Sequence, residues 1–427
     1  MIERGIQYNK KTNFRWAIVA LLFFATTINY FDRFLMGILA PYLEKEIGWS
    51  ELEYGYIISS FQFAYAIGTF LMGYLIDRIG TRWGFALAVG FWSIASMLHA
   101  AAKGWIGFAL ARIGLGLSEA GNFPAAIKTV AEWFPKKERA LATGLFNGGS
   151  NVGAILAPLT IPLIIASMGS WKWVFILSGF LGFFWLIFWL LLYKNPGQSR
   201  FVNEAEIKYI NEGEEEADGK PLNWIKLLKY RQTWAVALGK LFADPVWYFY
   251  LYWGAKFLNS TYGIDLKELA LPLVVIYVVA DLGGIAGGAV SSYLIRKGKS
   301  INYSRKTTML GSAILVLPVM TVPYQSNMFM SVGLIALAAA AHCSWSANIF
   351  TVATDLFPKK AVATVTGFAT TVSTIGGMIT ALLLGYILNE SGTEGYKTAF
   401  ALASFGYLIG ISIIHILVPR MNPQKNV

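Results

Sequence analysis

The chain is poor in the residues that enzymes and metalloproteins commonly use. Its 427 positions include one cysteine, three histidines and only 14% charged residues. Because Cys343 is alone, no intramolecular disulfide can form. The histidines lie in separate apolar segments and show no metal-ligand spacing. They are His99, His342 and His415. These absences argue against an enzyme and against a bound metal or other cofactor. The first 16 residues also lack the apolar core and cleavage site of a signal peptide, so the first apolar segment is expected to remain as structure.

Apolar residues, in contrast, are abundant. They make up 56% of the chain, which is too many for a soluble protein of this length. Twelve segments are long enough to cross about 30 Å of hydrocarbon, at 15–41, 55–76, 83–102, 104–131, 140–168, 172–193, 233–258, 269–295, 307–323, 329–355, 362–388 and 397–418. Runs such as Leu21–Tyr30 do not alternate between polar and apolar residues, so they predict helices and not barrel strands. The sequence predicts an all-α integral membrane protein with twelve transmembrane helices.

The distribution of lysine and arginine predicts the orientation. Cations on one side include Arg4, Lys10, Lys11, Arg15, Arg78, Arg82, Lys136, Lys137, Arg139, those of the central loop, Arg296 to Lys306, Lys359, Lys360, Arg420 and Lys425. The other side has only Lys45, Lys103, Lys172, Lys267 and Lys397. Positive residues favour the cytoplasmic side, so both termini are expected there, in a plasma membrane or the inner membrane of a Gram-negative bacterium. This topology explains the net charge of +11, and no nucleic-acid partner is expected.

Charged residues inside the apolar segments are the strongest functional signal. Asp32 and Arg33 are adjacent in the first segment, and Arg112 and Glu119 lie seven residues apart in the fourth. Ionisable groups are costly in a bilayer and typically line the path of a solute or proton. Three further cations, Lys128, Lys240 and Lys256, also fall within segments. Lys128 and Lys256 are near segment ends and are expected to extend to the membrane surface. The pattern predicts a transporter.

The chain is also internally duplicated. Phe134-Pro-Lys-Lys, followed by Ala140, Thr143, Gly144, Ser150 and Gly153, recurs 223 residues later as Phe357-Pro-Lys-Lys, Ala363, Thr366, Gly367, Ser373 and Gly376. Such repeats build transporters from two pseudo-symmetric halves with the solute site between them. We expect a six-helix half at 1–194, a charged cytoplasmic linker at 195–231 and a second six-helix half at 232–427.

Three motifs resemble a known family. Gly73-Tyr-Leu-Ile-Asp77-Arg78-Ile-Gly80-Thr-Arg82 resembles the signature loop of the major facilitator superfamily, and its charges are candidates for a conformational latch between the halves. Asn29-Tyr-Phe-Asp-Arg33 and the segment from Arg112 to Pro124 resemble the anion:cation symporters. The stretch 125–140 is most similar to the hexuronate transporters. The resemblance covers nearly the whole chain and implies proton-driven import of a sugar acid anion by a protein that is expected to be a monomer in contact with lipid.

The resemblance and the chemistry of a sugar acid suggest site residues. Arg33 has the planar fork that suits a carboxylate, and the matching position binds the substrate in family members, where the position matching Tyr65 lines the pocket. Polar side chains able to bond hydroxyls are Asn29, Asn147, Ser150 and Asn151 in the first half, and Trp345, Asn348 and Thr370 in the second, with His342, Ser346 and Thr371 as further candidates. The same residues can instead mediate helix packing. The aromatic run 244–253 is either a pocket wall or an interfacial belt.

Proton coupling is assigned to the acids. Asp32 and Glu119 match positions that titrate in family members, and Arg112 can pair with Glu119 or compete for Asp32. A purely structural ion-pair network is the alternative. Three other functions stay open: a symporter of galactonate, glucarate or a similar anion, an antiporter, and a transporter-like sensor. Antiport is disfavoured because Gly153-Ala-Ile-Leu-Ala-Pro158 departs from the Gly-Pro-x-x-Gly-Gly element of facilitator-fold antiporters.

Overall fold

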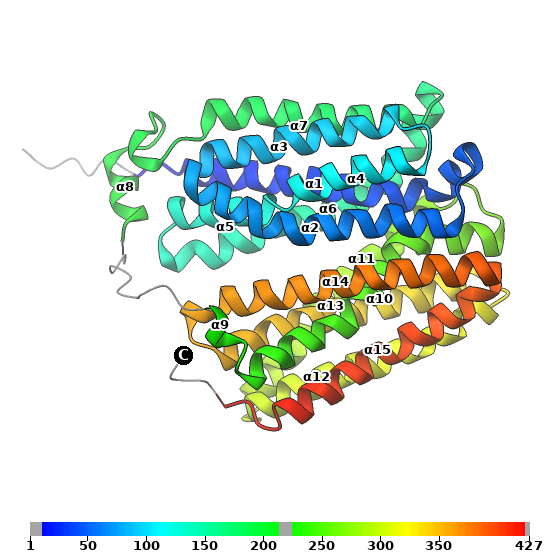
Figure 1. Cartoon of the computed structure of the whole chain (residues 1–427). Helices are drawn as coiled ribbons and strands as arrows, with labels where there is room; N and C mark the ends of the chain where they lie inside the picture. Colours follow the sequence, from blue (N-terminus) through cyan, green and yellow to red (C-terminus); the bar gives the residue numbers. More distant parts are fainter. Residues whose placement is uncertain (1–10, 213–223, 423–427) are drawn as a thin grey trace, which may run out of the picture.

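The fold consists of two groups of long helices laid against each other. The computed structural model describes residues 11–212 and 224–422, and all regular elements in these ranges are helical. The upper group in Figure 1 contains α1 (Arg15–Ile47), α2 (Glu51–Ile79), α3 (Thr81–Leu98), α4 (Trp105–Glu119), α5 (Asn122–Trp133), α6 (Lys136–Met168) and α7 (Lys172–Leu192). The lower group contains α10 (Arg231–Tyr262), α11 (Ala270–Arg296), α12 (Ile301–Val316), α13 (Met328–Leu356), α14 (Lys359–Ser391) and α15 (Gly395–Leu417).

Two short helices lie at one end of the bundle, near the link between the groups. They are α8 (Glu204–Ile210) and α9 (Trp224–Leu227), and both fall within the predicted linker 195–231. We call this the linker end and the opposite one the far end. The predicted cations Arg4, Lys10 and Lys425 and the acidic residues Glu214, Glu215, Glu216 and Asp218 lie outside the described residues.

The predicted twelve spans are accounted for, with one correction. In the described ranges, nine helical stretches are long and apolar enough to cross a membrane, and the last of these, Thr364–Leu417, contains most of α14 and all of α15. The remaining two spans are α10, whose charges lower its hydropathy, and the predicted segment 104–131. That segment is not one helix but two, because α4 ends at Glu119 and α5 begins at Asn122. Pro124 stands in the first turn of α5, where its missing N–H costs no hydrogen bond.

The turn between α1 and α2 is fixed by local signals. Gly48 ends α1 in the left-handed conformation (φ 79°), which glycine adopts without steric cost. Ser50 then caps α2: its hydroxyl accepts from the Glu53 amide at 3.2 Å, while the Glu53 carboxylate accepts from the Ser50 amide at 2.7 Å. This capping box places the last turn of α1 beside the first turn of α2 at the far end.

Contacts between the two groups gather in the half of the bundle nearer the far end. Gly37 of α1 packs against the backbone of α10 at Leu251, and Gly55 of α2 packs against α14 at Ala381. The Tyr54 hydroxyl donates to the Tyr252 carbonyl at 2.7 Å. A larger side chain at either glycine would collide with backbone, since an added Cβ would lie 2.3 Å from the Leu251 oxygen or 2.9 Å from the Ala381 oxygen. These close approaches hold the groups together at the far end.

Candidate functional site

The side chain of Arg33 is enclosed by aromatic rings and a carboxylate. Its guanidinium carbon lies 4.6 Å from the Tyr65 ring centre, 4.9 Å from that of Tyr30 and 5.5 Å from that of Phe61. Its Nη2 lies 3.2 Å from Oε2 of Glu119 on α4, and its side chain is 11% exposed. Stacking and a charge-assisted pair both favour arginine over lysine here. The structure brings together the predicted residues Arg33, Tyr65 and Glu119.

The broken helix explains why Glu119 meets Arg33. Glu119 is the last residue of α4, where the carbonyl dipoles concentrate partial negative charge. Arg33 lies beside this terminus, and the Asn29 amide donates to the backbone carbonyl of Glu119 at 3.4 Å. The break thus supplies acceptors inside the membrane where an unbroken helix would have none. Asn29, predicted to share the face of Arg33, is buried and contacts the same turn.

Asp32 points to a different pair of helices. Its Oδ1 accepts hydrogen bonds from Ser96 on α3, at 2.8 Å, and from Ser178 on α7. It is buried, and its Oδ2 has no hydrogen-bond partner in the described ranges. Two neutral hydroxyl donors stabilise a buried carboxylate less than an arginine does. Asp32 and Glu119 therefore occupy distinct environments, although Asp32 is directly adjacent in sequence to Arg33, the partner of Glu119.

Arg112 does not pair with Glu119. Its side chain is buried, its guanidinium carbon lies 5.2 Å from the Phe61 ring centre, and none of its three nitrogens has a hydrogen-bond partner within the described part of the chain. Other buried polar atoms without such partners lie on α1, α2, α4 and α10: Oδ1 of Asn29, both side-chain polar atoms of Gln62, Oε1 of Glu119 and the Tyr252 hydroxyl. Because buried polar groups are normally satisfied, this concentration of unpaired donors and acceptors fits a binding site for a polar solute.

The other polar residues predicted on the first half do not join this cluster. Asn147 and Asn151 are exposed on α6, and the Ser150 hydroxyl donates within α6, to the Asn147 carbonyl at 2.7 Å and to Oδ1 of Asn151 at 3.2 Å. The face of α6 that packs on α1 is formed instead by Gly149 and Gly153. The role of Asn147, Ser150 and Asn151 in binding substrate hydroxyls stays a prediction.

The predicted residues of the second half are mostly engaged in packing. Trp345 is buried between α13 and α15, with its ring centre 5.4 Å from that of Tyr407. Asn348 donates to the Ser344 and Gly287 carbonyls at 2.9 and 3.3 Å. His342 stacks on Trp247 and bonds the Tyr407 hydroxyl at 2.8 Å. The carbonyl of Thr370 accepts from the hydroxyls of Ser373 and Thr374, and the Thr371 hydroxyl donates to the Gly367 carbonyl.

The sequence left the aromatic run 244–253 of α10 open between a pocket wall and an interfacial belt, and it did not single out Tyr248. Tyr248 lies beside Gln62 of α2, because a Cβ added at Gly377 would be 2.1 Å from Gln62 Oε1 and 2.4 Å from Tyr248 Cδ2. The prediction that Lys256 extends to the membrane surface is wrong. Its side chain is buried, and its ammonium forms ion pairs with the carboxylates of Glu44 and Glu51, at 2.8 and 2.7 Å. The spacing of Glu44 and Glu51 around the Gly48 turn was the available signal for this pair.

The predicted latch residues lie at the linker end. Asp77 pairs with Lys128 of α5 at 2.8 Å, and its side chain is 76% exposed. Arg82 donates to the Leu190 carbonyl at 2.7 Å, and Arg78 lies 5.7 Å from the ring centre of Tyr74. Gly80 adopts a positive φ of 85° between α2 and α3, whereas nothing lies within 4 Å of a Cβ built at Gly73. These contacts all stay within the first group of helices.

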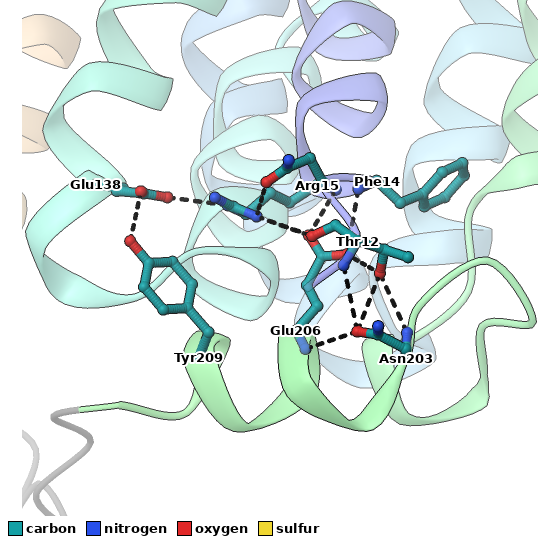
Figure 2. A network of polar contacts seen from close by, with 8 residues as sticks. Thr12, Phe14, Arg15, Glu138, Asn203, Glu206 and Tyr209 are labelled. Carbon is teal, nitrogen blue, oxygen red and sulfur yellow. Dashed lines mark hydrogen bonds and ion pairs between the residues drawn. The ribbon is translucent and has the colours of Figure 1, made fainter. Parts of the chain in front are cut away.

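The linker helix α8 is fastened to the first group by a polar network (Figure 2). The fully buried Glu206 accepts from Arg15 Nη1 at 2.8 Å and from the Thr12 hydroxyl at 2.6 Å. Glu138 of α6 accepts from Arg15 Nε at 2.9 Å and from the Tyr209 hydroxyl at 2.7 Å. Burial alone would raise the pKa of Glu138, but the hydrogen bonds from Tyr209 and Arg15 outweigh it and hold this pKa below its usual value. The network anchors the start of the linker to α1 and α6.

Comparisons with known proteins agree with this architecture. The sequence model of the Major Facilitator Superfamily matches residues 22–317 and 300–427. The chain is 32% identical to the hexuronate transporter of Escherichia coli (strain K12), over 94% of this chain and 93% of that protein. It is 33% identical to the galacturonate transporter of Dickeya chrysanthemi, over 76% of this chain and 95% of that protein.

Among solved structures, the fold resembles a bacterial homologue of the human lysosomal transporter Spinster in its inward-facing, occupied conformation. The TM-score is 0.79 at 19% identity, with 96% of this chain and 98% of the other covered. Family match, sequence relatives and fold lead to one assignment. The chain belongs to the Major Facilitator Superfamily, and it is a transporter rather than an enzyme.

Proposed function

We propose that this protein is a proton-coupled symporter that imports a sugar acid anion, a hexuronate such as galacturonate or glucuronate. The ion pair between Arg33 and Glu119 is the observation that carries the proposal. Only Oε2 of Glu119 engages Arg33, and Oε1 has no hydrogen-bond partner in the ranges described above. A guanidinium has five donors, so Arg33 retains donors for the carboxylate of a substrate.

The substrate and Glu119 compete for Arg33 in this mechanism. An unpaired carboxylate is costly to bury, so Glu119 is stable as an anion while Arg33 pairs with it. When a substrate carboxylate takes Arg33, Glu119 binds a proton. When the substrate leaves, Glu119 pairs with Arg33 again and releases the proton. This exchange links each anion to a proton, and Asp32 is a second candidate proton site.

The surroundings of Arg33 suit a sugar acid. Tyr30 and Tyr65 offer aromatic faces on which a sugar ring can lie, and the unpaired groups of Gln62 and Arg112 are positioned on α2 and α4 beside them. Hydroxyl groups of a sugar both donate and accept, so they match a mixture of amide, phenol and guanidinium groups. The named hexuronate and galacturonate transporters among the relatives support a uronate in particular.

The cation distribution supports a cytoplasmic location for the linker end, in a cell membrane that is the inner membrane if the source is a Gram-negative bacterium. The far end, where the two groups touch, would then face outward. The proposal includes a monomer that requires no cofactor, and the driving force is the proton gradient.

An uptake panel tests the proposal. The purified protein is reconstituted into vesicles, and radiolabelled galacturonate, glucuronate, galactonate, glucarate and xylose are compared with and without an imposed pH gradient. The proposal predicts accumulation of a uronate that collapses when a protonophore is added. Accumulation that ignores the pH gradient but follows a sodium gradient, or transport of xylose and no sugar acid, would contradict it.

A further inference from the structure

A groove of about 380 Å³ lies on the second group of helices, between α11, α12 and α13. It is on the outside of the group, because α12 packs mainly against α11, α13 and α15 and lies at the lower edge of Figure 1. Small residues form its floor: a Cβ added at Gly283 would lie 2.3 Å from the Ala340 carbonyl oxygen. Val290 and Leu315, which also line it, are about half exposed. In a membrane transporter, an apolar groove on this surface faces lipid.

The groove runs from the middle of α11 toward the linker end. On this helix it is lined by Gly283, Gly287, Val290 and Leu294, and their spacing of four, three and four residues keeps one helix face. From Gly283 to Leu294 the helix rises about 16 Å. This is close to half of the ~30 Å hydrocarbon thickness of a bilayer. The groove therefore has the length of an acyl chain in one leaflet, the leaflet at the linker end.

Two lysines stand where the groove reaches the linker end. Lys297 follows Leu294 by three residues and continues the same face of α11. The chain then turns back, so that the Lys299 amide donates to the Leu294 carbonyl at 3.1 Å. The ammonium nitrogens of Lys297 and Lys299 lie 5.5 and 5.8 Å from the ring centres of Tyr293 and Tyr303, respectively. Both rings are about half exposed, as expected for tyrosines at the level of lipid headgroups.

This turn carries positive charge that no described acid neutralises. In the first half of the chain, Tyr74-Leu-Ile-Asp77 contains an acid that forms an ion pair. The repeat in the second half reads Tyr293-Leu-Ile-Arg296, so an arginine replaces the acid. The side chains of Arg296, Lys297 and Lys299 are all exposed, and none of them forms an ion pair in the described part of the chain. The turn is therefore free to bind an anion from outside the protein.

We propose that the groove and the turn together bind an anionic phospholipid from the leaflet at the linker end. One acyl chain lies in the groove, and the phosphate of the headgroup contacts Lys297 and Lys299. In the proposed orientation this is the cytoplasmic leaflet, whose surface carries anionic lipids. A zwitterionic lipid has the same chains but no net charge, so it binds more weakly. The site goes beyond the proposed function, since neither Arg33 nor the transported solute takes part in it.

The double variant Lys297→Ala/Lys299→Ala tests the charge. The purified full-length protein in detergent is titrated with dioleoylphosphatidylglycerol or with dioleoylphosphatidylcholine, which has the same acyl chains, and bound lipid is measured by native mass spectrometry. The preference of the wild-type protein for phosphatidylglycerol should fall roughly thirtyfold in the variant, since each lysine contributes about fivefold. Lys226→Ala/Lys229→Ala removes two other exposed lysines near the linker end and should keep the preference. A preference that survives in Lys297→Ala/Lys299→Ala would overturn the proposal.

Filling the groove tests the acyl-chain site. Gly311 lines the groove on α12, and nothing lies within 4 Å of a Cβ built there, so Gly311→Leu occupies the groove without displacing a neighbour. It should weaken the binding of both lipids several-fold and leave their ratio unchanged. Gly333→Leu, at an exposed glycine of α13 with the same free space, is the control and should bind like the wild type. Ala286→Leu fills the groove from α11 if Gly311→Leu does not fold. Wild-type binding by a folded groove-filling variant would overturn the proposal.

Free phosphate is the other anion that this turn could attract, and competition distinguishes it from a lipid. Inorganic phosphate has no acyl chain for the groove, so it should not displace phosphatidylglycerol at equal concentration. Displacement would assign the turn to a free anion and overturn the lipid site. None of these measurements uses a transported solute. If the protein took up no sugar acid, the proposed function would fail while the lipid result would stand.

Discussion

The guanidinium of Arg33 and the carboxylate of Glu119 meet at 3.2 Å through a single oxygen of the acid. Both side chains are largely enclosed, and the second oxygen of Glu119 has no partner within residues 11–212 and 224–422. A pair of this kind can be opened by a competing anion at a smaller cost than a two-pronged one.

Replacing Arg33 by lysine keeps the charge but should impair transport. A lysine ammonium cannot contact both a carboxylate and the rings of Tyr30 and Tyr65 as the planar guanidinium does. Loss of one charge-assisted hydrogen bond corresponds to about 1.5–3 kcal/mol, or roughly tenfold to hundredfold in apparent affinity. The measurement is the concentration dependence of galacturonate uptake in vesicles. Near-normal affinity would remove Arg33 from carboxylate binding.

Lys256 is expected to keep the far end closed. Lys256→Met leaves Glu44 and Glu51 facing each other without their shared cation, and like charges at this distance repel. A cysteine placed at Ile58, which is fully buried two helical turns after Glu51 on α2, should then react several-fold faster with an impermeant maleimide applied from the far end, in a background where Cys343 is replaced by serine. Lys256→Arg serves as the control. Equal labelling of all three proteins would show that the pair does not close this end.

The pair between Asp77 and Lys128 should affect turnover more than stability. Asp77 is 76% exposed, and an exposed ion pair stabilises a protein by about 0–1 kcal/mol. Asp77→Asn should therefore leave the melting temperature nearly unchanged, and it should leave substrate affinity nearly unchanged because the loop is far from Arg33. The maximal uptake rate should fall, because the proposed latch acts on the conformational change and not on binding. A variant with the wild-type maximal rate would show that the latch is dispensable.

The docking of α8 should withstand moderate acid. The pKa of Glu138 is held below its usual value in the folded protein, so its contribution is present above the unfolded pKa and is lost only as the pH falls through the lower, folded pKa. The protection of the α8 amides against exchange, measured relative to their intrinsic rate at each pH, should stay constant from pH 8 to 5 and be lost only below about pH 4. Tyr209→Phe, which deletes one hydrogen bond to Glu138, should move this loss to higher pH. A transition near pH 6 in the wild-type protein would contradict the assignment.

Much of this arrangement follows from the sequence, and the exceptions have physical causes. The twelve spans and the charged residues within them were predictable, because long apolar runs and the charges that interrupt them are visible in one dimension. The break at Gly121 was not, since Glu119 and Pro124 are each compatible with an unbroken helix. Lys256 was misjudged because its partners on α1 and α2 lie some 200 positions away: the spacing of Glu44 and Glu51 marks a possible cation site, but only the packing of the two groups identifies Lys256 as the cation.

The central claim is that Glu119 carries the coupled proton, and Glu119→Gln tests it most directly. A glutamine mimics the protonated acid, so the variant should still bind galacturonate and exchange it between the two sides of a vesicle that holds substrate on both. It should not accumulate galacturonate against a gradient when a pH gradient is imposed, because no proton is released in each cycle. Retention of exchange together with loss of accumulation is the predicted result. Full proton-driven accumulation by Glu119→Gln would contradict the account and leave Asp32 as the candidate proton site.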